Sequence, residues 1–410
     1  MSLAFFMRFI SVASALSICL IILILWPQDK EYVQVNPISE ACSFVSHHIF
    51  LDDELVRPWH KRCAEIAQQN LNLDLSYQRQ QFRLHLSGLN VSHLDLFEPQ
   101  EVKNIWSENK KSTGILAEFI DGQLIVVEVM PGSSAVKSEV KTGDQILSIN
   151  QEAPSPHLAQ EISGEYIFDR KGQKLTLQIE VSELVVNEKW QVSKISDKTA
   201  HLKIPSFRAN YFSKEDLVEM SNQLKSYKKI ILDLRKNQGG NFVSGLRLLS
   251  VFFCGPQSLG YLIRPKFPNL PKVNMPDDLN DENQLDLMNK SYYMNLQSFS
   301  NYPCLTQSLS LLVDHETAST SEMVAQALKD YRGARIFGNP SGGKLLVGVW
   351  YPMERLGTGV KISVPEAVYQ TKRGRQIENN GVHLDEVLDY RREDFEKGVD
   401  TWLKNVLSKF

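Results

Sequence analysis

Residues of the kind that nucleophilic catalysis uses gather first in Thr317-Ala-Ser-Thr-Ser-Glu322, between an apolar run and a helical pattern. A serine at a strand-to-helix junction is exposed at the carboxyl edge of a sheet, where the next backbone N–H can meet an oxyanion. This placement makes Ser319 a candidate nucleophile. Helix capping is the alternative role of these hydroxyl groups, with Thr320 or Ser321 as the cap.

A reactive serine needs a base, and the sequence offers both histidine and lysine. His315 lies four residues before Ser319, and Lys344 ends the segment Asn339-Pro-Ser-Gly-Gly-Lys344. Glycines before the lysine let the backbone approach closely. A lysine acts as a base only when it is neutral, which requires burial away from carboxylates. The alternative for Lys344 is a solvated loop lysine.

A third segment, Leu232 to Asn241, runs from an apolar strand pattern into Gly239 and Gly240 and then into a helical pattern. Backbone N–H groups at such a turn can bind an anion or an oxyanion. The alternative is a plain turn that needs a positive φ. The segment is not a phosphate-binding loop, because no Gly-Lys-Ser/Thr follows at the required spacing.

Together these segments resemble the carboxy-terminal processing, or tail-specific, serine peptidases over nearly the whole chain that follows the N-terminal apolar run. The core is matched by ILDLRKNQGG, TASTSE, GNPSGGK and Gly381-Val-His-Leu-Asp385. Ser112-Thr-Gly-Ile-Leu116, Val129–Ala135 and Lys141–Asn150 match the PDZ domain of that family, and the segment that starts at Ser92-His-Leu-Asp matches the lead-in to it.

The resemblance implies a Ser–Lys dyad, with Ser319 as the nucleophile and Lys344 as the base. The two residues are 25 positions apart, which is the family's own spacing. The N–H groups of Gly239 and Thr320 would stabilise the oxyanion. No metal, nucleotide or other cofactor is required. The implied partners are protein or peptide substrates with accessible C-termini.

A PDZ domain binds an extended C-terminal peptide by strand addition, and the resemblance places Gly114, Ile115 and Leu116 around the peptide carboxylate. That loop departs from the Gly-Φ-Gly-Φ form that is common in PDZ domains.

The core also departs from the family pattern. Leu345 stands where a glycine usually follows the lysine, Gly348 replaces a glutamine that helps to orient it, and Leu384 replaces a late proline. The sequence after Pro340 also resembles the retinoid-binding-protein-like and tricorn-type peptidases, in which the lysine is not the base. Two alternatives therefore stay open. One is an inactive, anchored scaffold, and the other is a Ser–His hydrolase that uses His315 or His383.

Patterning along the chain predicts three parts after an N-terminal segment at residues 1–31. Residues 32–110 show helical spacing, residues 111–185 show short strands separated by turns, and residues 186–410 alternate strands with helices. The expected fold is a helical region, a small β-rich PDZ-like domain and an α/β peptidase core. Residues 263–305 are polar and read as an insertion or lid, and residues 393–410 as a terminal helix.

Composition supports this organisation. The 410 residues are 42% hydrophobic and 23% charged, which is typical of two or three globular domains. The mean hydropathy of -0.24 excludes a polytopic membrane protein. A net charge of -3 gives no electrostatic reason to expect nucleic-acid binding.

The N-terminal segment differs from the rest of the chain in charge, because Phe9 to Trp26 contains no charged residue. Its 18 positions are just long enough to span a bilayer as a helix. Arg8 before the run and acidic residues after it predict a cytoplasmic N-terminus. We expect a single-pass anchor in the inner membrane, with the catalytic part in the periplasm or outside. A cleaved signal peptide, which would give a secreted protein, is the alternative.

Four cysteines follow this segment, an even number that permits two disulfides in an exported protein. We predict that Cys42 pairs with Cys63 and Cys254 with Cys304, because each pair falls within one region. Free buried thiols are the alternative. No cysteine or histidine cluster has the spacing of metal ligands.

Overall fold

The computed structural model describes residues 36–409, except for residues 106, 278 and 281–282. The apolar run at residues 9–26 therefore lies outside the described part of the chain. Within that part, no helix combines the length and the apolar character that crossing a bilayer would require.

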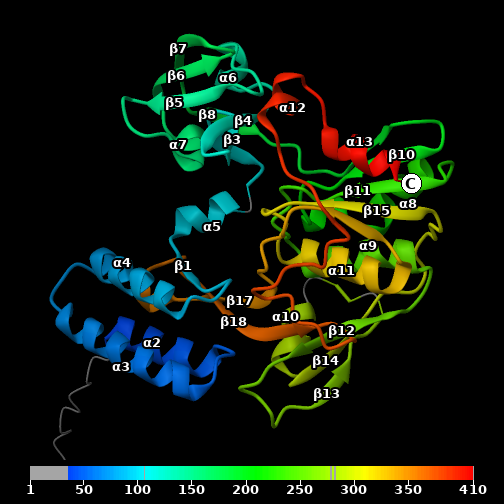
Figure 1. The fold of residues 1–410 in the computed structure, drawn as a ribbon. Helices are drawn as coiled ribbons and strands as arrows, with labels where there is room; N and C mark the ends of the chain where they lie inside the picture. The colour runs from blue at the N-terminus through cyan, green and yellow to red at the C-terminus, as the bar shows by residue number, and fades with distance from the viewer. Residues whose placement is uncertain (1–35, 106, 278, 281–282, 410) are drawn as a thin grey trace, which may run out of the picture.

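The first region is a bundle of three helices that packs against one edge of the core (Figure 1). Asn36 caps the first helix by accepting a hydrogen bond from the N–H of Ile38 at 2.8 Å. The disulfide between Cys42 and Cys63 joins the first two helices and confirms the predicted pairing. The helices are α2 (Pro37–His48), α3 (Asp53–Gln69) and α4 (Leu75–Leu86). Their apolar faces share one core with strand β18 (Lys361–Gln370) of the peptidase part.

The second region confirms the predicted β-rich domain. Its sheet has the order β3-β4-β5-β6-β7, and all neighbouring strands are antiparallel. Strands β2 (Asn109–Ser112) and β8 (Ser182–Val185) pair where the chain enters and leaves the domain. The remaining elements are α5 (Pro99–Ile105), β3 (Ile115–Ile120), β4 (Gln123–Val129), α6 (Ser134–Lys137), β5 (Gln145–Ile149), α7 (Pro156–Glu161), β6 (Gly164–Arg170) and β7 (Gln173–Ile179).

The third region confirms the predicted alternation of strands and helices. Its main sheet has the order β19-β16-β15-β11-β10-β9, and every pair except β9 with β10 is parallel. The strands are β9 (Gln191–Lys194), β10 (Thr199–Lys203), β11 (Lys229–Asp233), β15 (Ser308–Val313), β16 (Arg335–Gly338) and β19 (Glu386–Val387). The helices are α8 (Lys214–Leu224), α9 (Phe242–Phe253) and α11 (Thr320–Arg332).

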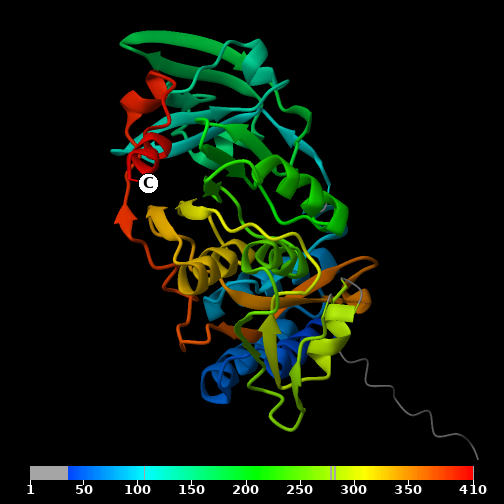
Figure 2. The ribbon, with the colours of Figure 1, turned by 90° about the vertical axis from the view of Figure 1, so that its right-hand side faces the viewer.

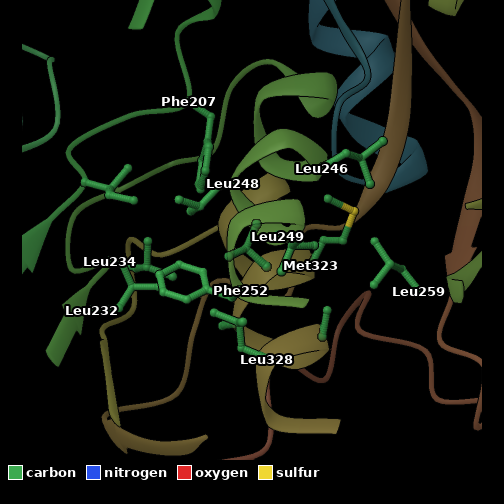
Figure 3. Close-up of a cluster of buried hydrophobic side chains, with 14 of the residues drawn as sticks. Phe207, Leu232, Leu234, Leu246, Leu248, Leu249, Phe252, Leu259, Met323 and Leu328 are labelled. Atoms are coloured by element: carbon green, nitrogen blue, oxygen red, sulfur yellow. The ribbon is translucent and has the colours of Figure 1, made fainter. Parts of the chain in front are cut away.

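Helices α9 and α11 pack against each other over this sheet, and their apolar side chains fill the main core (Figure 3). Leu249 and Phe252 of α9 are fully buried with Met323 and Leu328 of α11. Gly245 permits the close approach, because a Cβ there would lie 2.5 Å from Cγ2 of Thr320. The packing therefore fixes the N-terminus of α11, which directly follows the candidate nucleophile.

A second sheet joins the helical bundle to the core, in the order β1-β18-β12-β14-β13 with β17 paired to β18. Its further strands are β1 (Asp95–Phe97), β12 (Ser258–Ile263), β13 (Lys272–Asn274), β14 (Tyr293–Gln297) and β17 (Leu346–Pro352). Residues 263–305, expected as an insertion or lid, supply β13, β14 and helix α10 (Asn283–Asn289). These strands are short and separated by polar connections, so the sequence pattern did not predict them. The Cys254–Cys304 disulfide, which was also predicted, closes this segment.

The chain ends in two short helices, α12 (Arg392–Glu396) and α13 (Thr401–Ser408), and not in the single helix expected over residues 393–410. Gly398, with φ at 63°, breaks the helical path between them. Helix α12 lies against the PDZ domain, far along the chain from it (Figures 1 and 2). Contact is direct, because Thr142 Oγ1 donates to the carbonyl oxygen of Phe395 at 3.2 Å.

Candidate active site

Ser319 lies at a tight turn between strand β15 and helix α11. Its backbone is in the positive region at φ 57° and ψ -124°, which a side chain other than glycine adopts at an energetic cost. The opposite loop must come very close, because a Cβ on Gly239 would lie 2.8 Å from the Cβ of Ser319. Strain of this kind is typical of a nucleophile held up at the edge of a sheet.

The carboxylate of Glu322, three residues after the serine, organises the surrounding loop. It is fully buried and accepts the N–H of Ser319 at 3.1 Å and the N–H of Lys344 at 2.9 Å, both on Oε2. Its Oε1 accepts the N–H of Gly343 at 2.7 Å and the hydroxyl of Ser341 at 2.6 Å. Burial raises the pKa of Glu322, and these hydrogen bonds oppose that rise. The backbone of Lys344 is thereby fixed beside that of Ser319.

The side chain of Lys344 is exposed, and among the described residues it forms no ion pair and no hydrogen bond to the hydroxyl of Ser319. The structure thus brings the two predicted dyad residues together at the level of the backbone. It does not place the lysine nitrogen on the serine oxygen.

The two predicted oxyanion donors also lie at this point, but they differ in whether the N–H group already has a hydrogen-bond partner. The N–H of Thr320 belongs to the first residue of α11, where helices leave amides without internal partners. The N–H of Gly239 donates to Oδ1 of the buried Asn237 at 2.9 Å. Thr320 ties the two loops together, since its hydroxyl donates to the carbonyl oxygen of Gly240 at 3.0 Å.

A second set of residues, which sequence patterning missed, lies along the segment that follows Lys344. Glu378 accepts the N–H of Leu346 at 3.1 Å and the hydroxyl of Ser92 at 3.0 Å, both on Oε2. The oxygen of Ser92 lies 3.0 Å from Nδ1 of His93. Ser92 and His93 come from the lead-in to β1, so segments more than 250 residues apart meet here. We call Ser92, His93 and Glu378 the histidine relay.

Hydrogen-bond chemistry sets the tautomer of His93. The single hydroxyl proton of Ser92 is donated to Glu378, so its oxygen can only accept from the imidazole. Nδ1 therefore carries the ring proton, and the lone pair is on Nε2, as a general base requires. Within the described residues, this nitrogen has no hydrogen-bond partner. Burial, and then the nearby charge of Lys344, lowers the pKa of His93 to about 4.

Gly348 explains how the histidine fits. A Cβ at this position would lie 2.9 Å from the Cβ of His93 and 2.6 Å from Oγ of Ser363. His93 therefore occupies the space next to β17 that a larger residue at position 348 would fill. Its own backbone is in the positive region, at φ 61°. The sequence signal was the histidine in the lead-in segment together with this glycine, but nothing in the sequence joined the two.

The other candidate bases lie elsewhere. His383 is exposed beyond helix α11, and its N–H donates to Oε1 of Gln326 at 3.2 Å. His315 is exposed at the boundary with the PDZ domain, where its ring nitrogen and carboxylate oxygens of Glu118 and Glu316 lie within 4.8 Å of one another. Such a donor set could hold a divalent cation. Spacing along the chain could not reveal it, because Glu118 belongs to β3 of the PDZ domain.

The predicted peptide-binding loop of the PDZ domain leads into β3, which is the first strand of its sheet. The N–H of Gly114 donates to Oγ of Ser112 at 3.0 Å, and that of Ile115 donates to Oγ1 of Thr113 at 3.1 Å. Both amides that would face a peptide carboxylate therefore have side-chain partners. Leu116 packs against the buried cluster of Ile120, Ile125 and Val127, which Tyr390 and Phe395 of the C-terminal segment also contact. The other edge of β3 has no strand partner among the described residues.

A cavity of about 420 Å³ lies between the PDZ domain, the core and α12. Its lining includes Glu128, Arg235, Lys236 and Tyr390, but neither Ser319 nor His93. The cavity therefore belongs to the junction of the domains and not to the candidate active site.

Comparison with known families supports the assignment made from these features. Residues 198–388 match the model of peptidase family S41, and residues 104–180 match that of the PDZ domain. The chain thus combines a PDZ domain with an S41 peptidase core, and the resemblance to carboxy-terminal processing serine peptidases is confirmed.

Individual relatives are distant. A probable CtpA-like serine protease of Staphylococcus aureus (strain N315) is 23% identical over 315 residues, which is 71% of this chain and 58% of that protein. The chain thus spans less than two thirds of this relative's length. A carboxyl-terminal-processing protease of Picosynechococcus sp. is 22% identical over 325 residues, covering 74% of this chain and 71% of that protein.

Two solved structures share the fold. The photosystem II D1 C-terminal processing protease superposes with a TM-score of 0.56 at 19% identity, covering 87% of this chain and 94% of the other. Mature CPAF superposes with a TM-score of 0.60 at 14% identity, covering 90% and 96%.

Proposed function

We propose that this protein is a serine peptidase in which Ser319 is the nucleophile and His93 is the general base. The observation that carries the proposal is the histidine relay, because it fixes the tautomer that leaves the Nε2 lone pair of His93 available. The contacts at Glu322 and Glu378 support the proposal, because they hold Lys344 beside Ser319 and the Ser92–His93 pair beside Leu346.

In the proposed mechanism, Oγ of Ser319 attacks a peptide carbonyl while Nε2 of His93 takes the hydroxyl proton. The histidine then returns this proton to the leaving amine, and water repeats the sequence to release the acyl group. Ser92 and the Glu378 carboxylate keep the imidazole in place and stabilise its cationic form. The N–H of Thr320 faces the developing oxyanion, and that of Gly239 joins it once it turns away from Asn237.

The Ser319–Lys344 dyad is the second candidate mechanism. It is favoured by the 25-residue spacing and by the shared contacts of both backbones with Glu322. The exposed position of the lysine side chain disfavours it, since a base must lose its charge in a site away from water.

For substrates, we propose unstructured proteins or peptides whose C-termini dock on the PDZ domain by adding a strand to the open edge of β3. The amides of Gly114 and Ile115 would then exchange their side-chain partners for the peptide carboxylate. We further propose that residues 9–26 anchor the protein in the inner membrane with the peptidase outside the cytoplasm. The two disulfides are consistent with this oxidising side.

The test is cleavage of an unfolded protein substrate by the purified chain and its variants. Ser319→Ala and His93→Ala should each reduce kcat/KM by about four orders of magnitude. Ser92→Ala should cost about 10- to 100-fold, because it removes a partner that only orients the base. His157→Ala, an exposed histidine of the PDZ domain, is the matched control and should keep full activity.

Two results would contradict the proposal. Unchanged cleavage by Ser319→Ala would remove the peptidase assignment from this site. Full activity of His93→Ala, with activity lost only in Lys344→Ala, would establish the dyad in place of the histidine. If no variant or substrate shows turnover, and a serine-reactive probe does not label Ser319, the inactive scaffold is the better description.

A further inference from the structure

If His93 is the base, the role of the charge on Lys344 needs another explanation. The side chain is exposed two positions before Leu346, whose N–H donates to Glu378 of the histidine relay. Among the described residues, no carboxylate pairs with it. Glu322, which accepts the backbone N–H of Lys344, uses both of its oxygens for backbone and hydroxyl donors. An unpaired cation therefore stands at the rim of the candidate active site.

We propose that Lys344 binds a carboxylate of the substrate next to the scissile bond, which makes peptides with an acidic side chain or a free C-terminus there the preferred substrates. This inference rests on the proposed function, with Ser319 as nucleophile and His93 as base. The shared chemistry is a carboxylate within reach of an ammonium group, whichever of the two sources supplies it.

A substrate carboxylate bound to Lys344 should also affect the chemical step. His93 becomes an imidazolium when it takes the serine proton, and the positive charge of Lys344 opposes this. Glu378, acting through Ser92, is the acid that faces His93, while its neighbours on β17 and β18, Gly348 and Ser363, carry no charge. A substrate carboxylate on Lys344 would cancel the opposing charge as the imidazolium forms. We therefore expect acidic substrates to have a higher kcat as well as a lower KM.

A carboxylate bound to Lys344 should also change the pH dependence of the reaction. Neutralising Lys344 with a bound carboxylate removes one cause of the low pKa of His93. The acid limb of kcat, which reports the enzyme–substrate complex, should then lie at higher pH with an acidic peptide than with its neutral counterpart. The acid limb of kcat/KM reports the free enzyme and should coincide for both peptides.

The experiment compares matched peptides on the full chain. Cleavage sites are first mapped in a digested unfolded protein, and fluorogenic peptides are then made around one site. In the first pair, one peptide has Glu and the other has Gln at the positions flanking the scissile bond. In the second pair, one peptide has a free C-terminus and the other has an amidated C-terminus. We expect the acidic member of at least one pair to be favoured by about fivefold in kcat/KM, which is the range of an exposed ion pair. The pair that shows the preference identifies the source of the carboxylate.

Variants then assign the preference to the lysine. Lys344→Ala should abolish the ratio between acidic and neutral peptides, Lys344→Glu should invert it, and Lys344→Arg should restore it. Lys198→Ala, an exposed lysine beside β10, should leave both the ratio and the activity unchanged.

The outcomes separate this inference from the proposed function. A ratio near one in the native chain, or a ratio that Lys344→Ala does not change, would overturn the role of Lys344 while Ser319 and His93 remain essential. Equal loss of all substrates in Lys344→Ala, with a folded protein and no rescue by arginine, would instead identify the lysine as the base. Turnover by Ser319→Ala would show that the proposed function itself has failed.

Discussion

At the scale of single residues, the molecule concentrates unusual backbone and side-chain states at one place. Ser319 and His93 both have positive φ values, and both stand where glycines make room for them. Such conformations cost about 1–3 kcal/mol each and persist only where the surrounding contacts enforce them. Two of them converge on the segment from Lys344 to Gly348, which supports the choice of this site over the exposed His315 and His383.

The base can be identified from the pH dependence of the reaction. The pKa of His93 is lowered to about 4, so the residue is neutral and competent over the whole range above that value. We expect kcat/KM for a neutral peptide to rise as the pH increases through about 4 and then to stay level toward neutrality. Near-ultraviolet circular dichroism at each pH should show that the protein remains folded. A profile that rises only on the alkaline side would point to a lysine base.

At the scale of elements, Glu322 holds the start of α11 and the loop before β17 in one arrangement. One buried carboxylate accepts hydrogen bonds from four donors on the two segments, so it holds the backbones of Ser319 and Lys344 together. The glycine at position 245 lets α9 approach the same end of α11. The catalytic geometry therefore depends on contacts between elements that the chain connects only through long loops.

Replacing Glu322 by Gln tests this dependence. The amide keeps the shape of the side chain but turns one acceptor into a donor that faces N–H groups. We expect a loss of about 1–3 kcal/mol in the free energy of unfolding, as for a buried group left without a partner. We also expect kcat to fall. Denaturant titration and kinetics measure the two effects, and Glu215→Gln at the exposed start of α8 is the control. An unchanged kcat would mean that the loop keeps its geometry without this carboxylate.

At the scale of the whole molecule, two separate parts of the chain contact the PDZ domain. Nζ of Lys236, just before the Gly239 turn, lies 3.5 Å from Oε2 of Glu128 on β4. From the C-terminal segment, Arg392 of α12 donates to Oε1 of Gln123 at 3.1 Å and to Oε1 of Gln145 at 3.0 Å. The C-terminal segment thus fastens a domain that lies more than 200 residues earlier in the chain (Figure 2).

Removal of the Arg392 contacts should increase local opening of the PDZ domain without unfolding the core. In Arg392→Ala, amide hydrogens of α12 and of β4 to β6 should exchange several times faster, as expected for a local opening that loses about 1 kcal/mol. Those of β11 and β15 should exchange at the native rate. Arg391→Ala removes a neighbouring guanidinium that is mostly exposed and serves as the control. Equal exchange in the two variants would show that Arg392 does not hold the domains together.

The sequence by itself determined much of this protein. Largely apolar runs such as residues 229–234 and 309–313 predicted the buried parallel strands, because a strand covered on both faces is apolar at most positions. The cysteine pairing followed from grouping by region, and Ser319 stood out because a serine between such a strand and a helix is a local feature. The short strands within residues 263–305 did not stand out, because half-exposed strands broken by polar loops carry only a weak pattern.

Only the tertiary structure decided which residues meet the segment after Lys344. His93, Ser92 and Glu378 come from opposite ends of the chain, and their hydrogen bonds form only after β1, β17 and β18 assemble into one sheet. The spacing of Ser319 and Lys344 was visible in the sequence, but the direction of the lysine side chain was not, because packing and not chain separation sets it. Spacing along a chain constrains neighbours in a loop, whereas proton transfer depends on which atoms folding brings within hydrogen-bonding distance.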